Sequence, residues 1–190
     1  MQITSAKFIK GVIGTDTILQ DNTPQVAFIG RSNAGKSSLL NSITKSAKLA
    51  ITSDTPGRTR EINVFFVNGT HYFLDLPGYG YARAGSQTLN KLGRLIFWYL
   101  FESGTNPTVV ILIDAVVGPT SDDLAMLREM EKAGKDIVVV LNKVDKIKKS
   151  QYLNQLKKLA LQIPGHTLFP YSSKTKIGIT ELTDRLLKAN

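Results

Sequence analysis

The sequence contains no cysteine, so disulfides and thiolate metal sites are excluded. Its two histidines, His71 and His166, have no potential ligands beside them, and we predict no metal site on either. Long apolar runs are also absent: the run at residues 95–101 is much shorter than the span of about 20 residues that crosses a membrane. The first residues lack the charged and apolar regions of a signal peptide. We therefore expect a cytoplasmic protein with no membrane partner.

Acidic residues are scarce relative to basic ones. The 190 residues include 24 Lys and Arg against 15 Asp and Glu, which gives a formal net charge of +9 at pH 7. This balance favours a polyanionic partner, and we expect nucleic acid. The basic stretch over residues 143–158 has two open interpretations, a solvated helix face and an RNA-contacting patch. The length predicts a single domain with a substantial core.

Strand-like and helix-like segments alternate from about residue 25 onward. Apolar, mostly β-branched runs predict six strands, at residues 26–29, 62–67, 71–76, 108–115, 136–141 and 168–171. Asn68-Gly69 predicts a hairpin, and hence an antiparallel pair, between the second and third runs. Helical patterns follow at residues 36–43, 121–133, 150–162 and 180–187, and the aromatic residues at 97–101 fit one amphipathic helix. The sequence thus predicts an α/β fold: a doubly wound, six-stranded, mostly parallel sheet with one antiparallel edge strand.

The segment at residues 30–37 joins the first of these strands to the first helix and matches the pattern G-x-x-x-x-G-K-[ST]. Glycines allow backbone N–H groups to surround phosphate oxygens, and the helix N-terminus adds a favourable dipole. We expect Lys36 to reach the β- and γ-phosphates and the Ser37 hydroxyl to coordinate Mg²⁺. The predicted phosphate-contacting residues are Gly30, Arg31, Ser32, Asn33, Ala34, Gly35, Lys36, Ser37 and Ser38.

A second motif, Asp75-Leu76-Pro77-Gly78, ends another predicted strand. The Asp75 carboxylate can hold Mg²⁺ through water, and the Gly78 N–H can approach the γ-phosphate because no side chain blocks it. Irregular segments at residues 45–60 and 78–88 adjoin this region, and long loops inside a compact domain are often functional.

The first irregular segment contains a candidate sensor of the γ-phosphate. The Thr59 hydroxyl could bind Mg²⁺ only while the γ-phosphate holds the segment in place, which would make it a switch. Composition alone leaves Thr52 and Thr55 as alternatives.

A third motif, Asn142-Lys143-Val144-Asp145, predicts recognition of guanine, and therefore binding of GTP and GDP. The Asp145 carboxylate can accept the paired N–H donors of guanine, which adenine does not present. We expect Asn142 to brace the neighbouring loops and the Lys143 stem to lie over the base. Further along, Ser172-Ser173-Lys174 follows a predicted strand and could direct a backbone N–H at the guanine O6.

With these residues the chain resembles the EngB (YihA/YsxC) family of bacterial ribosome-assembly GTPases, from about residue 24 to the end. The resemblance rests on residues 30–41, on residues 55–59 and above all on residues 75–82. It implies a Ras-like P-loop GTPase domain at residues 24–190, preceded by an N-terminal extension at residues 1–23. It also implies Mg²⁺ on Ser37 and Thr59, and catalytic roles for Lys36, Thr59 and Gly78. Further nucleotide contacts are expected from Gly57, Arg58, Thr59, Arg60 and Glu61.

The resemblance further implies a partner, the large ribosomal subunit or its precursor with its rRNA, and a requirement for normal cell division and septation. A GTPase of tRNA modification or small-subunit assembly shares the same motifs, and a division scaffold with little hydrolysis is a third possibility. We expect a monomer. Residues 114–118 differ from the Asp-Ser-Arg-His-Gly common in the family, which bears on partner contacts.

Tyr79 stands where Ras-like switches carry the glutamine that orients the attacking water. We therefore expect slow intrinsic hydrolysis that a partner or a monovalent cation completes. Asn33 resembles the asparagine with which related potassium-dependent GTPases hold K⁺. For Tyr79 and Tyr81, stacking on a partner or RNA and local packing are equally open.

Overall fold

The computed structural model describes residues 1–46, 49–50, 61–79 and 86–188. Its strands are β1 (Ala6–Val12), β2 (Gln25–Gly30), β3 (Ile62–Val67), β4 (His71–Asp75), β5 (Thr108–Asp114), β6 (Ile137–Asn142) and β7 (Leu168–Pro170). Its α-helices are α1 (Lys36–Ile43), α2 (Ser86–Phe97), α3 (Ser121–Lys132), α4 (Tyr152–Gln162) and α5 (Ile179–Leu186). Shorter helical turns are η1 (Thr17–Leu19), η2 (Trp98–Glu102), η3 (Val144–Lys146) and η4 (Lys149–Gln151).

The strands form one sheet in the order β1-β3-β4-β2-β5-β6-β7. β3 is antiparallel to both of its neighbours, whereas the other pairs are parallel. The sheet therefore has seven strands and not six, and the antiparallel strand is second from the edge. β1 escaped prediction because most of its side chains stay exposed or half-buried, so it has no apolar run that would mark it as a strand.

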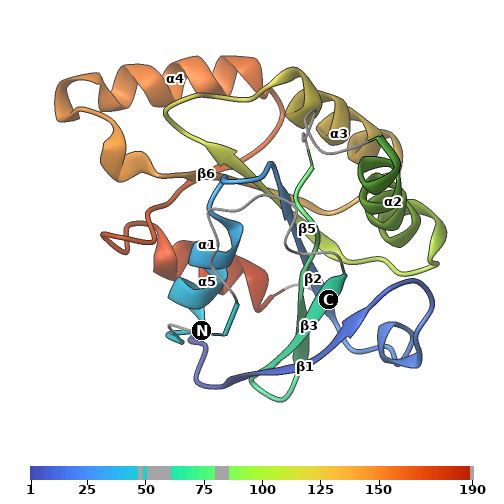
Figure 1. Cartoon of the computed structure of the whole chain (residues 1–190). Helices are drawn as coiled ribbons and strands as arrows, with labels where there is room; N and C mark the ends of the chain where they lie inside the picture. Colours follow the sequence, from blue (N-terminus) through green and yellow to red (C-terminus); the bar gives the residue numbers. More distant parts are fainter. Residues whose placement is uncertain (47–48, 51–60, 80–85, 189–190) are drawn as a thin grey trace.

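Helices cover both faces of the sheet, as a doubly wound fold requires (Figure 1). β2 shows how one strand serves both faces. Ala27 and Ile29 pack with buried residues of α2, α3 and α4, whereas Val26 and Phe28 pack with buried residues of α1 and α5. A strand buried on both faces reads as a continuous apolar run, which is why the sequence identified the central strands well.

Local sequence signals agree with the structure at two turns. Asn68 and Gly69 both adopt positive φ, 53° and 70°, as the predicted hairpin needs. The expected aromatic helix is α2, which continues into a π-helical turn, η2, where Tyr99 is buried. α2 begins at Ser86, so the last part of the segment expected to be irregular, residues 86–88, is helical. Within the described ranges, every helix is too short or too polar to span a bilayer.

Candidate nucleotide site

Four neighbouring strands place candidate residues along one edge of the sheet. In the spatial order β4, β2, β5 and β6, the last residues are Asp75, Gly30, Asp114 and Asn142. Parallel strands with helices on both faces bind ligands beyond their carboxyl ends, where loops from adjacent strands meet. The fold thus brings together residues that are more than a hundred positions apart in the sequence.

The loop after β2 has the backbone geometry of a phosphate-binding turn. Asn33 and Gly35 adopt positive φ, 65° and 93°, and Gly35 is the N-cap residue of α1. The Ala34 N–H donates to the Arg31 carbonyl at 3.0 Å, which closes the turn. A side chain at Gly35 is excluded twice, because φ is left-handed and because a Cβ there would lie 2.3 Å from Nδ2 of Asn142. The turn therefore requires a glycine directly before the N-terminus of α1, the end of the helix that favours an anion.

Lys36 and Asp75 form a buried ion pair in which the ammonium donates to Oδ1 of the carboxylate. Lys36 is 8% exposed and Asp75 is 2% exposed. The structure thus joins the two charged groups that the sequence assigned to phosphate and to Mg²⁺. The Ser37 hydroxyl and the Asp75 carboxylate offer the hard oxygen donors that Mg²⁺ prefers, so these residues fit the metal. No cluster of three or more acidic or histidine ligands occurs in the described part of the chain, so water and phosphate oxygens would complete the shell.

Asn142, at the end of β6, holds the phosphate loop from the opposite side. Its Nδ2 donates to the Ala34 carbonyl at 2.8 Å, and its Oδ1 accepts the Lys143 N–H at 2.8 Å. The side chain is 1% exposed, so both hydrogen bonds are shielded from water. The bracing contact expected of Asn142 is therefore present in the structure.

Lys143 links the base-recognition motif to two other loops. The residue has φ of 65°, and its ammonium donates to the Asn33 carbonyl at 2.7 Å and to Oδ2 of Asp114 at 2.8 Å. Oδ1 of Asp114 accepts the N–H groups of Val116 and Val117. Burial raises the pKa of Asp114, but the hydrogen bonds from Lys143 and from these N–H groups outweigh it and lower the pKa overall.

Asp114 was not predicted to act at the site. It ends a strand as Asp75 and Asn142 do, and that position was the available signal. Its partner, Lys143, could not be inferred from spacing because 29 residues separate them.

Asp145 is held by the loop that follows β7. The Ser172 hydroxyl, which is fully buried, donates to Oδ1 of Asp145 at 2.6 Å and accepts the Thr175 N–H at 3.0 Å. The Val144 N–H also donates to the Tyr171 carbonyl at 3.2 Å. Ser172 therefore positions the Asp145 carboxylate, a side-chain role that differs from the backbone role predicted for residues 172–174.

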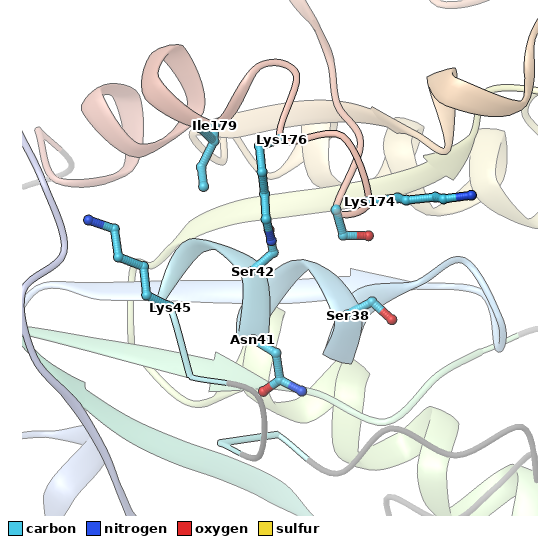
Figure 2. A pocket seen from close by; sticks show the side chains of 8 residues that line it. Ser38, Asn41, Ser42, Lys45, Lys174, Lys176 and Ile179 are labelled. Carbon is cyan, nitrogen blue, oxygen red and sulfur yellow. The ribbon is translucent and has the colours of Figure 1, made fainter.

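A groove of about 670 Å³ continues from this loop along α1 (Figure 2). Its lining residues are Ser38, Asn41, Ser42, Lys45, Ser173, Lys174, Lys176 and Ile179. Lys176 points down onto α1 and donates to Oγ of Ser42 at 2.8 Å, whereas Lys45 and Lys174 extend toward opposite ends of the groove. The lining has three lysines and no carboxylate, so the groove is electropositive.

Gly78 lies against the phosphate loop. A Cβ on Gly78 would come within 3.2 Å of the Ser32 nitrogen, so a larger residue would push the two segments apart. The next residue, Tyr79, donates its N–H to the Gly30 carbonyl and accepts the Ser32 N–H, both at 3.3 Å. These contacts fix Gly78 beside the place where a γ-phosphate is expected.

The remaining predicted residues are only partly described. Gly57, Arg58, Thr59 and Arg60, with the alternatives Thr52 and Thr55, lie outside the described residues, as does Tyr81. Glu61 is described: it precedes β3, whose Asn63 pairs with Asp75 at the same sheet edge, and its carboxylate lies against Gly11 of β1. Leu76 and Pro77 continue the chain from Asp75 to Gly78, and the Leu76 N–H donates to the Phe28 carbonyl at 3.2 Å.

The fold and this constellation of loops define a P-loop GTP-binding protein. A family model described as "50S ribosome-binding GTPase" matches residues 25–143. The chain is 41% identical over 189 residues to the probable GTP-binding protein EngB of Clostridium perfringens strain 13, covering 98% of this chain and 96% of that protein. It is 40% identical over 184 residues to the protein of the same name from Acholeplasma laidlawii, covering 96% of each. The chain belongs to the EngB family of GTP-binding proteins.

Solved structures share the fold. Era in complex with MgGDPNP and a segment of 16S ribosomal RNA superposes with a TM-score of 0.72 at 26% identity, covering 87% of this chain. The chain spans 56% of the length of that Era protein. A crystal structure of a probable GTP-binding protein engB superposes with a TM-score of 0.69 at 23% identity, covering 87% of this chain and 97% of that one. Membership of this GTPase family supports GTP hydrolysis with Mg²⁺.

Proposed function

We propose that this protein hydrolyses GTP to GDP and phosphate as a switch in assembly of the large ribosomal subunit, and that normal cell division and septation depend on it. The observation that supports GTP binding is that three side-chain contacts lie together at one edge of the sheet. These are the Lys36–Asp75 pair, the Asn142 brace on the phosphate loop, and the Ser172 contact to Asp145.

The division of labour at the site follows from the chemistry of each group. The phosphate-loop N–H groups and Lys36 bind the phosphates, while Ser37, and Asp75 through water, would hold Mg²⁺. Bound Mg²⁺ neutralises charge on the β- and γ-phosphates. Gly78 offers its N–H to the γ-phosphate, and Thr59 is the proposed sensor in the first loop. Such contacts favour the in-line transfer of the γ-phosphoryl group to water.

We infer that hydrolysis is slow without a partner, because Tyr79 occupies the position of a water-orienting glutamine. The backbone carbonyl of Asn33 is bound by Lys143, which leaves its exposed side-chain amide as the ligand for a K⁺ ion. Single-turnover hydrolysis in K⁺ and in Na⁺, each with and without ribosomal subunits, tests this inference. Fast turnover that needs neither K⁺ nor a subunit would contradict it.

Two observations support a ribosomal partner: the basic charge of the chain, and the matching family model, which is described as "50S ribosome-binding GTPase". The basic stretch includes Lys146, Lys148, Lys149, Lys157 and Lys158, which are all exposed. None of the five pairs with a carboxylate among the described residues. On α4 the apolar side chains Tyr152, Leu156 and Leu159 pack onto the core, so Lys157 and Lys158 of the same helix face outward. An outward lysine face suits phosphate groups of RNA.

The test is co-sedimentation with purified large and small ribosomal subunits in GDP, in a non-hydrolysable GTP analogue and without nucleotide, at several salt concentrations. We expect analogue-dependent binding to the large subunit that weakens steeply as salt rises. Replacing the five lysines by glutamine should reduce binding, whereas Lys132→Gln on α3, where the lysine pairs with Glu129, should not. Preference for the small subunit would instead favour small-subunit assembly. If the hydrolysis assay detects no phosphate release with either subunit, a division scaffold with little hydrolysis is favoured.

A further inference from the structure

The side chain of Tyr79 crosses from the loop after β4 to the start of α3. Its hydroxyl donates to Oδ1 of Asp123 at 2.8 Å. Asp123 is 3% exposed, and its other oxygen accepts the N–H and the hydroxyl of Thr120 at 2.9 and 2.7 Å. Thr120 and Asp123 together form the capping box of α3. The Tyr79 phenol is thus bound to a carboxylate that the helix itself holds rigidly.

The Tyr79 phenol stays protonated and donates its hydrogen bond to Asp123. Burial, and then the charge and hydrogen bond of Asp123, raise the pKa of Tyr79 far above its ordinary value, although Arg31 opposes the rise slightly. The hydroxyl therefore keeps its proton at physiological pH. This arrangement also shows that Tyr79 is used in local packing, one of the two interpretations that the sequence left open.

Tyr79 is consequently tied at three points, by its N–H to Gly30, by its carbonyl to Ser32 and by its hydroxyl to Asp123. Gly78 precedes it directly and lies against Ser32. A residue fixed in its binding position before the ligand arrives has less freedom to lose on binding. The γ-phosphate of GTP would meet such a prepositioned N–H, whereas GDP has no group that reaches it.

We propose that the hydrogen bond between Tyr79 and Asp123 is a latch that holds Gly78 against the phosphate loop and thereby raises the affinity for GTP relative to GDP. The proposal rests on the proposed nucleotide function of Gly78. Tyr79 is a positioning residue in this scheme, since it acts through Gly78 and not on the reacting atoms. The latch also makes the start of α3 sensitive to the position of Gly78.

The test is the affinity of Tyr79→Phe for GDP and for a non-hydrolysable GTP analogue, measured by titration calorimetry with Mg²⁺. We expect the ratio of the affinity for the analogue to the affinity for GDP to fall about 3- to 10-fold. The reason is that the segment containing Gly78 must then be ordered when the analogue binds. GDP affinity should stay unchanged. Asp123→Ala should lower the ratio by a similar factor, and the double variant should show no further loss, because both changes remove one bond.

Two variants control for general effects. Tyr72→Phe removes another phenol–carboxylate bond of 2.8 Å, to Asp21, at the opposite end of β4, and should leave the ratio unchanged. Thr120→Ala removes the helix cap but keeps the Tyr79 acceptor, so it should lower stability and not the ratio. An unchanged ratio in Tyr79→Phe, or equal loss of both nucleotides, overturns the latch. Failure of the unaltered protein to bind either nucleotide would instead overturn the proposed nucleotide function.

Discussion

Replacing Ser172 by alanine should lower both the stability of the fold and the affinity for guanine nucleotides, for two different reasons. The Ser172 hydroxyl is the buried group that donates to Asp145 at 2.6 Å. A hydrogen bond to a charged group contributes about 1.5 kcal/mol at the lower end of its range, which is appropriate because Asp145 is half-buried. For a chain of this length that loss corresponds to a melting temperature lowered by about 3 to 6 °C.

Nucleotide affinity should fall for a different reason. Without Ser172 the Asp145 side chain must be ordered when the base binds, at a cost of about 0.5 to 1.5 kcal/mol, or about 2- to 13-fold in the GDP dissociation constant. IDP lacks the exocyclic amino group of guanine and offers Asp145 one donor fewer. A carboxylate that is free to rotate gains less from the second donor, so discrimination between GDP and IDP should narrow.

The assay is calorimetric titration of Ser172→Ala with GDP and with IDP, beside thermal unfolding without nucleotide. Ser103→Ala is the matched control, because the Ser103 hydroxyl donates to the Tyr99 carbonyl at 2.6 Å in a loop away from the site. The control should lose stability and keep its nucleotide affinities. If Ser172→Ala binds GDP and IDP as the unaltered protein does, the positioning role assigned to Ser172 is wrong.

Three further predictions follow from the same site. Asn142→Ala removes two buried hydrogen bonds, to Ala34 and from Lys143, and should lower the free energy of unfolding in urea by about 2 kcal/mol; a loss below about 0.5 kcal/mol would contradict the bracing role. The lowered pKa of Asp114 means that its pairing with Lys143 stabilises the fold above the ordinary carboxyl pKa and is lost as pH falls through the lowered value. Stability should thus fall more steeply below about pH 4 in the unaltered protein than in Asp114→Asn, and parallel profiles would refute this. Gly35→Ala should abolish nucleotide binding while circular dichroism stays unchanged, because a Cβ cannot occupy that position; retained binding would show that the loop can rearrange.

The parts of the fold that the sequence predicted well depend on local signals. α1 begins at Lys36 as expected, because the glycine before it allows the turn and the apolar spacing after it suits a helix. The hairpin at Asn68-Gly69 is another local feature, since both residues tolerate positive φ. The phosphate loop and the ends of β4 and β6 were located for the same reason: their residue types carry the chemistry on their own.

The parts that were missed depend on pairings between distant segments. β1 is defined by its pairing with β3, and neither its composition nor its periodicity marks it. The bond between Tyr79 and Asp123 joins residues 44 positions apart, and Tyr79 by itself suggests either packing or stacking. Which acceptor a buried hydroxyl reaches depends on how the helices lie over the sheet, and this arrangement is not encoded in any short motif.

The position of β1 has a consequence for how the chain is made. β1 pairs along its length with β3, from Ala6 opposite Val67 to Val12 opposite Ile62, so each residue of β1 is synthesised at least fifty residues before its partner. Until then the nascent chain carries an unpaired first strand. Once β3 and β4 have formed their hairpin, the outer backbone of β3 is an open edge beside the buried side chains Val64 and Val67. β1 closes that edge, so a strand translated well before its partner covers it and keeps the sheet from pairing with another chain.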